Sequence, residues 1–439
     1  MDAPHTPSAG GLSRRRAVAR GSAALLAAAR LLGPGLFAGC SSGLPPARRT
    51  VPVGLLHSQT GTMAISATGL RDIQIHALET INAGGGILGR TVDFLAPDPR
   101  SRTDLFPVRA RRLLEQGAVA VFGCWTSASR KAVLPVFEEF RRLLFYAVQY
   151  EGNESDQHVV YGGSVPNQQI LPLLDWLTGP EGGERRRLFL LGSDYVYPRT
   201  VNYIVRRQLA SKGLEPVGEA YVPLGERDFT AAVTAIRDCR ADCVLSTVNG
   251  DSNLGLFAAL AAAGIDPASV PVVSTSVGED ELRSLPAAQV AGHLAAAGYF
   301  QSIATPANRN WLAGFRAEFG HDRVAGDVME AGWCLVHLWK AAVEKAGSFD
   351  TTAVRQAFRD GLAFAGPGGP VRLDPRTQHC SRGFRIGRIR RDGQFDIVHA
   401  APAPIDPDPY PQVAFPGWSC DWTRGGVTRG EEVKIDGQL

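Results

Sequence analysis

The sequence predicts an α/β protein with two lobes, each built around a parallel sheet. With 439 residues, the chain is longer than one ordinary core requires, so two domains are expected. Its 44% apolar and 20% charged residues are typical of a globular protein. Short apolar runs alternate along the chain with segments whose apolar residues recur every three or four positions. This alternation is typical of strand–helix–strand units.

The first series of units begins at residue 51. The run "VPVGLLH" predicts a buried strand, and Leu70, Ile73, Ala77 and Ile81 then mark one face of a helix. This helix is expected to end at "NAGGGILG", because glycine tolerates the left-handed backbone of a helix end. Strands are expected next at "TVDFLAPD", "AVAVFG" and "LLFYAV", with intervening helices at 103–116 and 127–141.

The pattern restarts at "PNQQILPLLDWL", and this restart predicts a second sheet. A helix at 167–178 precedes the strand "RLFLLGS". Further helices are expected near 198–212, 228–238 and 253–264, alternating with the strands "VGEAYVP", "CVLSTV" and "VPVVSTS". Two long helical patterns, at 306–319 and 327–347, precede a region of short strands and Pro-rich loops.

The formal charge of +3 arises in the first 39 residues, which hold five arginines against the single acid Asp2. The rest of the chain is nearly balanced and has no basic patch, so we expect no nucleic-acid partner.

Residues 1–40 are predicted to be an export signal, with a basic cluster, an Ala/Leu-rich stretch and small residues before Cys40. The pair Arg14-Arg15 resembles a twin-arginine signal. "LFAGC" resembles a lipobox with Cys40 as the lipidated residue, although Phe37 departs from the usual pattern. We therefore expect a lipoprotein of the periplasm or cell surface, with 41–50 as a linker. An ordinary secretory leader or a disordered tail is the alternative.

Polar and aromatic side chains gather where the predicted strands end. Because ligands of open parallel sheets bind at the carboxyl ends of the strands, these runs predict a binding site between the lobes. The candidate ligand-binding residues are Trp125, Ser127, Tyr146, Gln149, Tyr195, Tyr197, Asn249, Asp251 and Thr275.

Hydroxyls, amides and aromatic rings indicate a small uncharged polar ligand. Such a ligand must exchange its water hydrogen bonds for protein ones, since each unpaired buried polar group costs ~1–3 kcal/mol. We expect no cofactor, because "AGGGILGR" lacks the Lys-Ser/Thr pair of a phosphate-binding loop. We expect no metal site, because no cysteine pair has zinc-finger spacing.

An enzymatic alternative is a Ser-dependent esterase or amidase. "NGDSN" contains a Gly-Asp-Ser block that resembles the nucleophile block of one esterase family, with Ser252 as the nucleophile. That block lies in mid-chain here, whereas it lies near the mature start in that family, and of the nine histidines only His57 is expected at the end of a predicted strand. Since a serine without a positioned base is a weak nucleophile, we expect no catalytic residue and no enzymatic activity.

Six of these segments closely resemble the urea and short-chain-amide substrate-binding proteins of bacterial ABC transporters. The similarity extends from about residue 51 to 412 and is carried by "GLLHSQTGTMAIS", "FGCWTSASRKAVLPVFEE", "QYEG", "PNQQI", "GSDYVYPRT" and "NGDSN". It implies a type I periplasmic-binding-protein fold, in which three crossover strands join two lobes that close around the ligand. It also implies delivery of the ligand to a membrane permease driven by an ATPase.

The same resemblance implies the division of the chain into discontinuous lobes. Residues 51–163 plus 296–347 are expected in the N-terminal lobe, and 164–295 plus 348–412 in the C-terminal lobe. Residues 413–439 are expected to form a tail.

A related branch, the cytosolic amide sensors of amidase operons, provides the alternative function. In that branch, a tyrosine at the position of Trp125 and a serine at that of Ser127 contact the amide. The family also uses the tyrosines at the positions of Tyr146, Tyr195 and Tyr197. Where the sensors have Thr-Pro, this chain has Val148-Gln149, so Gln149 is expected to take the polar role.

Structural roles compete with several of these assignments. Ser127 is equally suited to cap the helix at 127–141, and Trp125 to pack between strand and helix. Asn249 and Asp251 suit caps for the helix near 253. Glu279 with Asp280 suit a solvated loop, and Arg130-Lys131 a solvated or interlobe face. Urea versus a particular amide, cysteine pairing and oligomeric state stay open.

Overall fold

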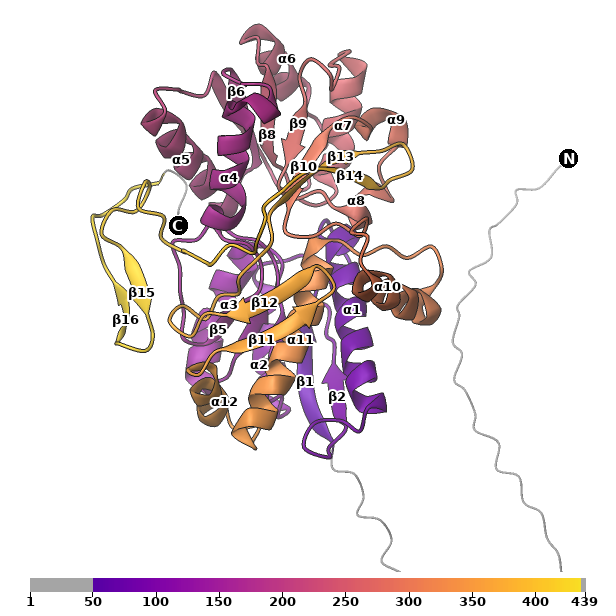
Figure 1. Cartoon of the computed structure of the whole chain (residues 1–439), viewed down its shortest axis with the longest axis vertical. Helices are drawn as coiled ribbons and strands as arrows, with labels where there is room; N and C mark the ends of the chain where they lie inside the picture. Colours follow the sequence, from indigo (N-terminus) through magenta and orange to yellow (C-terminus); the bar gives the residue numbers. More distant parts are fainter. Residues whose placement is uncertain (1–49, 436–439) are drawn as a thin grey trace, which may run out of the picture. The chain divides into compact units, whose positions relative to one another are not determined.

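The computed structural model describes residues 50–435, and these form two lobes (Figure 1). The predicted export signal with Cys40, and residues 41–49 of the predicted linker, lie outside this range. Within 50–435, no helix combines the length and apolar character needed to cross a bilayer.

The first lobe contains a five-stranded sheet in which every neighbouring pair is parallel. Its strand order is β2-β1-β3-β4-β5, so the first strand along the chain lies inside the sheet. The predicted alternation of strands and helices is confirmed here. The elements are β1 (Val51–Leu56), α1 (Ala64–Ala83), β2 (Val92–Leu95), α2 (Leu105–Glu115), β3 (Val121–Gly123), α3 (Ser127–Phe140), β4 (Leu144–Tyr146) and β5 (Val159–Tyr161).

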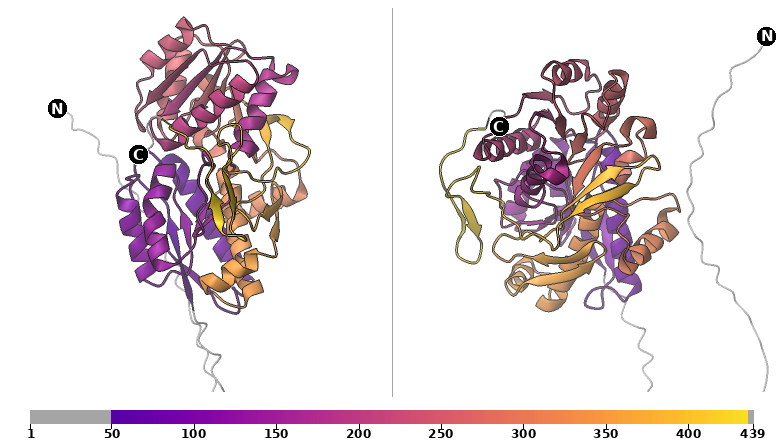
Figure 2. Two further views of the ribbon diagram at one scale, coloured as in Figure 1. Left: turned by 90° about the vertical axis from the view of Figure 1, so that its left-hand side faces the viewer. Right: turned by 45° about the horizontal axis from the view of Figure 1, so that its top comes forward.

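The second lobe contains a seven-stranded sheet of order β14-β13-β10-β9-β8-β6-β7. The five strands from β6 to β10 pair in parallel, and β13 and β14 join one edge in antiparallel fashion (Figure 2). The predicted second sheet is therefore confirmed. Its elements begin with α4 (Pro166–Thr178), η1 (Pro180–Gly182), β6 (Leu188–Ser193), α5 (Val196–Ser211), β7 (Gly218–Val222), α6 (Thr230–Asp238) and β8 (Cys243–Thr247). They continue with α7 (Ser252–Ala262), β9 (Val272–Ser274), α8 (Glu279–Leu282), α9 (Ala287–Val290), β10 (Leu294–Ala297), β13 (Arg385–Ile389) and β14 (Phe395–Ala400).

Three segments of the described chain connect the lobes. The chain leaves the first lobe after β5, returns after β10, and leaves again between β12 and β13. On its return it forms α10 (Pro306–Phe319), α11 (Asp327–Ala346), α12 (Thr351–Phe358) and the hairpin β11 (Leu362–Gly366)–β12 (Gly369–Leu373). The helix α11 packs beside α1, as Figure 1 shows.

The last crossing lies later in the sequence than expected. Residues 348–412 were all assigned to the second lobe, but Phe358, Val371 and Leu373 are buried in the hydrophobic core of the first. The reason is that α12 and β11 pack against α11, which extends the first-lobe core before the chain turns back. Only β13 and β14 from this stretch join the second sheet.

The segment expected as a tail from 413 is folded as far as 435. It contains the hairpin β15 (Ser419–Asp421)–β16 (Gly426–Thr428), and Phe415 packs with Ile204 of α5 in a small buried cluster. Trp422 reaches the first lobe, where its indole Nε1 donates to Ser155 Oγ at 3.1 Å. Aromatic side chains therefore attach this segment to both lobes.

The six cysteines between residues 50 and 435 are all free. Burial raises the pKa of the Cys124, Cys243 and Cys380 thiols to about 12 in each case. Thiols of this kind remain protonated and unreactive at neutral pH.

Candidate functional site

A cavity of about 40 Å³ lies between the two lobes. The first lobe contributes Trp125, Gln149 and Gly326 to its wall. The second lobe contributes Gln169, Thr275 and Glu279.

Trp125 lies in the turn that joins β3 to α3. Its ring is buried and lines the cavity, and its indole Nε1 has no hydrogen-bond partner in the protein. The backbone at this point is fixed by Tyr146, whose hydroxyl donates to the Trp125 carbonyl oxygen at 2.7 Å. Trp125 therefore packs in the first-lobe core, as the structural alternative suggested, and also lines the cavity.

Gln149 connects the lobes beside this cavity. Its side-chain Nε2 donates to the Thr275 carbonyl oxygen at 2.8 Å. The Thr275 hydroxyl in turn lies 2.9 Å from the Tyr197 hydroxyl. Burial raises the pKa of Tyr197 to about 12, so the phenol is neutral at physiological pH. Three of the candidate residues thus form one chain of hydrogen bonds across the gap.

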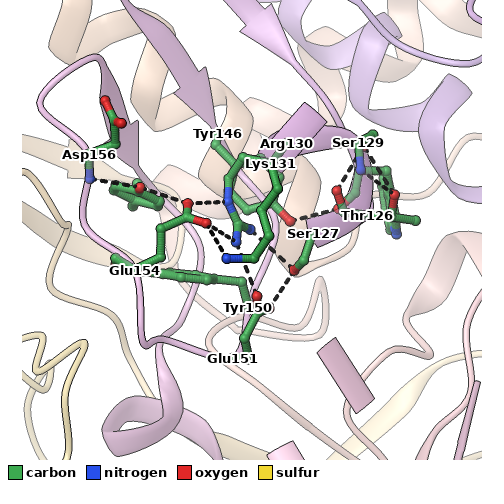
Figure 3. Close-up of polar contacts among 12 residues, drawn as sticks. Thr126, Ser127, Ser129, Arg130, Lys131, Tyr146, Tyr150, Glu151, Glu154 and Asp156 are labelled. Carbon is green, nitrogen blue, oxygen red and sulfur yellow. Dashed lines mark hydrogen bonds and ion pairs between the residues drawn. The ribbon is translucent and has the colours of Figure 1, made fainter. Parts of the chain in front are cut away.

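Ser127 belongs to a neighbouring network and does not line the cavity. Its hydroxyl donates to Glu151 Oε2 at 2.5 Å (Figure 3). The N-cap of α3 is Thr126, whose side chain accepts from the Ser129 amide at 3.1 Å, so the capping role suggested for Ser127 is wrong. Ser127 instead holds a buried carboxylate.

Arg130 is the centre of this network, and the solvated or interlobe face suggested for it is wrong. The guanidinium is fully buried and pairs with Glu154 at 2.7 Å and with Glu151 at 3.3 Å. It also lies over the ring of Tyr146, 4.7 Å from the centroid. Burial by itself would lower the pKa of Arg130, but Glu154 and Glu151 outweigh it and hold that pKa well above its usual value. Lys131 is partly exposed and pairs with Glu154 at 2.7 Å.

Tyr195, Asn249 and Asp251 also lie outside the cavity wall. Tyr195 is half-buried at the start of α5, with its ring 6.2 Å from that of Tyr197. Asn249 donates to the Thr247 carbonyl oxygen at 3.0 Å and so supports its own loop.

Asp251 joins the lobes at a second place. It occupies the N-cap position of α7 without capping the helix through its side chain. Its carboxylate instead accepts from the hydroxyl of Thr62, in the loop after β1 of the first lobe, and pairs with Arg227 at 2.8 Å. The capping role suggested for Asp251 is therefore wrong.

Glu279 and Asp280 lie in α8 and line the cavity wall, so the solvated loop suggested for them is wrong. Glu279 is only 1% exposed and Glu281 5%. Burial raises the pKa of Glu279 to about 8 and that of Asp280 to about 7. These acids follow a strand directly, in "STSVGED". Because ligands bind at the carboxyl ends of parallel strands, this position could have identified them as wall residues from the sequence.

Between residues 50 and 435, no group of three or more His, Cys, Asp and Glu side chains is arranged to hold a metal ion. Ser252, the nucleophile of the esterase alternative, is buried, and its hydroxyl accepts from the Gly225 amide at 2.9 Å.

Several solved structures of solute-binding proteins have a similar fold. A solute-binding protein of an ABC transporter from R. palustris, in complex with 4-hydroxybenzoate, is 20% identical, with a TM-score of 0.71 over 80% of this chain and 96% of that one. A branched-chain amino acid substrate-binding protein from Streptococcus pneumoniae, in complex with isoleucine, is 17% identical, with a TM-score of 0.69 over 82% and 100% of the two chains. A periplasmic binding protein from Burkholderia mallei is 15% identical, with a TM-score of 0.72 over 81% and 96%.

One curated protein, the limonene hydroxylase of Geobacillus stearothermophilus, is 32% identical over 119 residues. The match covers 27% of this chain and 22% of that protein, so this chain spans about a fifth of its length.

The family model described as the periplasmic binding protein domain matches residues 51–415. This range contains both sheets, the three connections and every residue named in the cavity wall. The predicted type I α/β fold with two parallel-sheet lobes is confirmed, and the chain belongs to the periplasmic binding protein family.

Proposed function

We propose that this protein is the extracytoplasmic substrate-binding component of an ABC importer and that it binds urea or a short-chain aliphatic amide. The observation that carries the proposal is the size of the interlobe cavity, about 40 Å³. One water requires roughly 10–15 Å³ measured in this way, so the cavity suits a molecule of only a few heavy atoms. 4-Hydroxybenzoate and isoleucine, the ligands of two structural neighbours, each have more than twice as many heavy atoms as urea.

The charge of the cavity wall supports the same class of ligand. Within residues 50–435, the wall contains no Lys, Arg or His side chain, whereas it contains the four acids Glu279, Asp280, Glu281 and Asp327. A ligand carboxylate would find no cationic partner in this wall, and its charge would be repelled by the acids there once they are ionised. An uncharged amide or urea needs none, and hydrogen-bonding groups such as Gln149 and Gln169 suit it.

The ligand acts by stabilising the closed arrangement of the lobes. Gln149 and Thr275 already meet across the gap, so a molecule bound beside them contacts both lobes at once. A ligand shifts the equilibrium only by its differential affinity for the two states, and contacts with both lobes exist only in the closed one. In this proposal, the permease recognises that state, while export by residues 1–40 and lipidation of Cys40 keep the protein at the membrane.

Isothermal calorimetry with urea, acetamide, formamide, isoleucine and 4-hydroxybenzoate tests the ligand class. The best tiny ligands gain about −1.5 kcal/mol per heavy atom, which limits urea to about −6 kcal/mol. This value corresponds to a dissociation constant of roughly tens of micromolar. Binding of isoleucine or 4-hydroxybenzoate without binding of urea or either amide would refute the proposal.

Trp125→Ala connects the result to the cavity. We expect it to weaken binding about tenfold, because it removes a wall and a donor together. Ser211→Ala, on the exposed end of α5, is the matched control and should bind as the unmodified protein does. Release of ammonia or a carboxylic acid during the titration would instead support the amidase alternative, and recovery of the protein in the cytosol would support the sensor alternative.

A further inference from the structure

The carboxyl group of Glu279 has one oxygen that the protein leaves without a partner. Oε1 accepts from the backbone N–H of Gln301 at 2.6 Å. The residue is only 1% exposed, so Oε2 is shielded from water, and it has no hydrogen-bond partner in the protein. A buried acceptor in this condition is costly, so its retention requires an explanation.

Gly326 leaves space beside this oxygen. A Cβ atom at Gly326 would lie 3.3 Å from Glu279 Oε2, and both residues line the cavity. Gly326 precedes α11 of the first lobe, whereas Glu279 begins α8 of the second. The unpartnered oxygen therefore lies where the two lobes face each other across the cavity.

The charged groups around Glu279 have partners of their own. Asp327 pairs with Arg382 at 2.5 Å, and Glu281 accepts from the Gly278 amide at 2.9 Å. Within residues 50–435, Glu279 forms no ion pair, and the acids that act on it, Asp327 and Glu281, only add to the negative field. In its carboxylate form, Glu279 thus offers the cavity an acceptor for a hydrogen-bond donor of the ligand.

A second unpartnered atom comes from the opposite lobe. Trp125 is 93% buried, lines the same cavity and has no acceptor for its indole Nε1. A ligand that carries both a carbonyl oxygen and an N–H group has one matching partner for each of these two atoms. Acetate and acetamide have the same shape, but only acetamide provides the N–H.

We propose that Glu279 is a ligand-binding residue that accepts an N–H of the ligand and excludes carboxylates, with the ligand carbonyl directed to Trp125. This inference rests on the proposed function, because it assigns the roles of two residues in that same cavity. It restricts the ligand class to molecules with both a carbonyl oxygen and at least one N–H, namely urea and primary or secondary short amides.

Glu279→Gln tests the assignment, with urea, acetamide, acetate and N,N-dimethylacetamide as the probes in calorimetry at pH 9, where Glu279 is a carboxylate because its pKa is about 8. The unmodified protein should bind urea or acetamide at least tenfold more tightly than acetate or the dimethyl compound, neither of which has an N–H. In the variant, an amide NH₂ replaces the accepting oxygen, so the affinity for acetamide should fall about 10- to 100-fold and the preference over acetate should shrink. Glu181→Gln makes the same substitution at an exposed acid of the second lobe, and it should bind as the unmodified protein does.

Gly326→Ala keeps the charge of Glu279 and tests the same contact independently. The added methyl group would cover Oε2, so it should weaken binding of acetamide by a similar factor. This variant keeps the proposal testable if Glu279→Gln does not fold. Equal affinities for acetamide in the unmodified protein and both variants would overturn the role of Glu279 and leave the proposed function intact. Failure of the unmodified protein to bind urea or any amide would overturn the proposed function itself.

Discussion

Among single residues, the buried polar atoms divide into those with a protein partner and those without one. Ser127, Tyr146 and Tyr197 have hydroxyls that are bonded to other parts of the protein. Trp125 Nε1 and Glu279 Oε2 are buried without partners. The first set holds the walls in position, and the second set is free to bind.

Ligand affinity should depend on pH through Glu279. Burial raises the pKa of this group to about 8, and Asp327, Glu281 and Tyr299 are the titratable groups that act on it. Only the carboxylate form accepts an N–H at both oxygens, so the affinity for acetamide should rise as the pH increases from 7 to 9. Calorimetry across this range measures the effect, and the rise should vanish in Glu279→Gln. An affinity that is constant with pH in the unmodified protein would contradict this role.

The helix α3 shows how an element is fixed beside the site. Arg130 projects from its first turn into a buried set of acids and tyrosines, which ties the helix to the loop after β4. The expectation that polar groups gather at the ends of the parallel strands correctly identified the start of this helix. It did not distinguish Ser127, which bonds to Glu151, from Trp125, which meets the cavity, because periodicity does not specify the direction of a side chain in a turn.

Arg130→Met should destabilise the protein by about 3–5 kcal/mol, because it leaves Glu151 and Glu154 buried without their cation. Lys131→Met is the matched control, since this neighbour also pairs with Glu154 but is 36% exposed. Its cost should stay below about 1 kcal/mol. Thermal unfolding without added ligand compares the two variants, and equal losses would show that the buried network is not the source of stability.

The order of the strands and helices was predictable from the sequence, but the lobe to which some of them belong was not. Apolar repeats identified α11, four of the five strands of the first sheet and four of the seven strands of the second, and they missed β5 and β10. They gave no information on α12 and the hairpin β11–β12, because the apolar face of a short element does not specify which core it joins. The same limit applies to the end of the chain, where Phe415 finds its partners in α5.

In the whole molecule, the two lobes meet through contacts away from the cavity as well as beside it. Thr62 and Asp251 form one such contact, between the loop after β1 and the loop before α7. Neither residue lines the cavity, so their effect on binding can act only through the relative stability of the closed state.

Thr62→Val should weaken ligand binding a few-fold, because it removes an interlobe hydrogen bond worth about 1 kcal/mol from the closed state. Small-angle X-ray scattering should show a larger radius of gyration for the unliganded variant than for the unmodified protein. Thr230→Val, at an exposed threonine that begins α6, is the control. A variant with unchanged affinity and unchanged scattering would show that this contact does not hold the lobes together.

Stability should fall in mild acid because of buried neutral histidines. Burial lowers the pKa of His57, His293 and His337 from 6.5 to about 4. Below pH 6.5 the unfolded chain gains protons that the folded protein resists, so the free energy of unfolding decreases as the pH falls toward 4. A shift of this size corresponds to roughly 3 kcal/mol for a fully buried group. Melting temperatures measured from pH 7 to 4.5 test this, and His57→Gln should flatten the decline.

The C-terminal segment is attached to both lobes, so its exposure should change when the lobes separate. Phe415 packs on the second lobe, and Trp422 donates to Ser155 of the first. Separation of the lobes must therefore detach one of these two attachments. Limited proteolysis of the peptide bonds near Arg424 should be faster without ligand than with it, which makes cleavage of this segment a label-free reporter of occupancy.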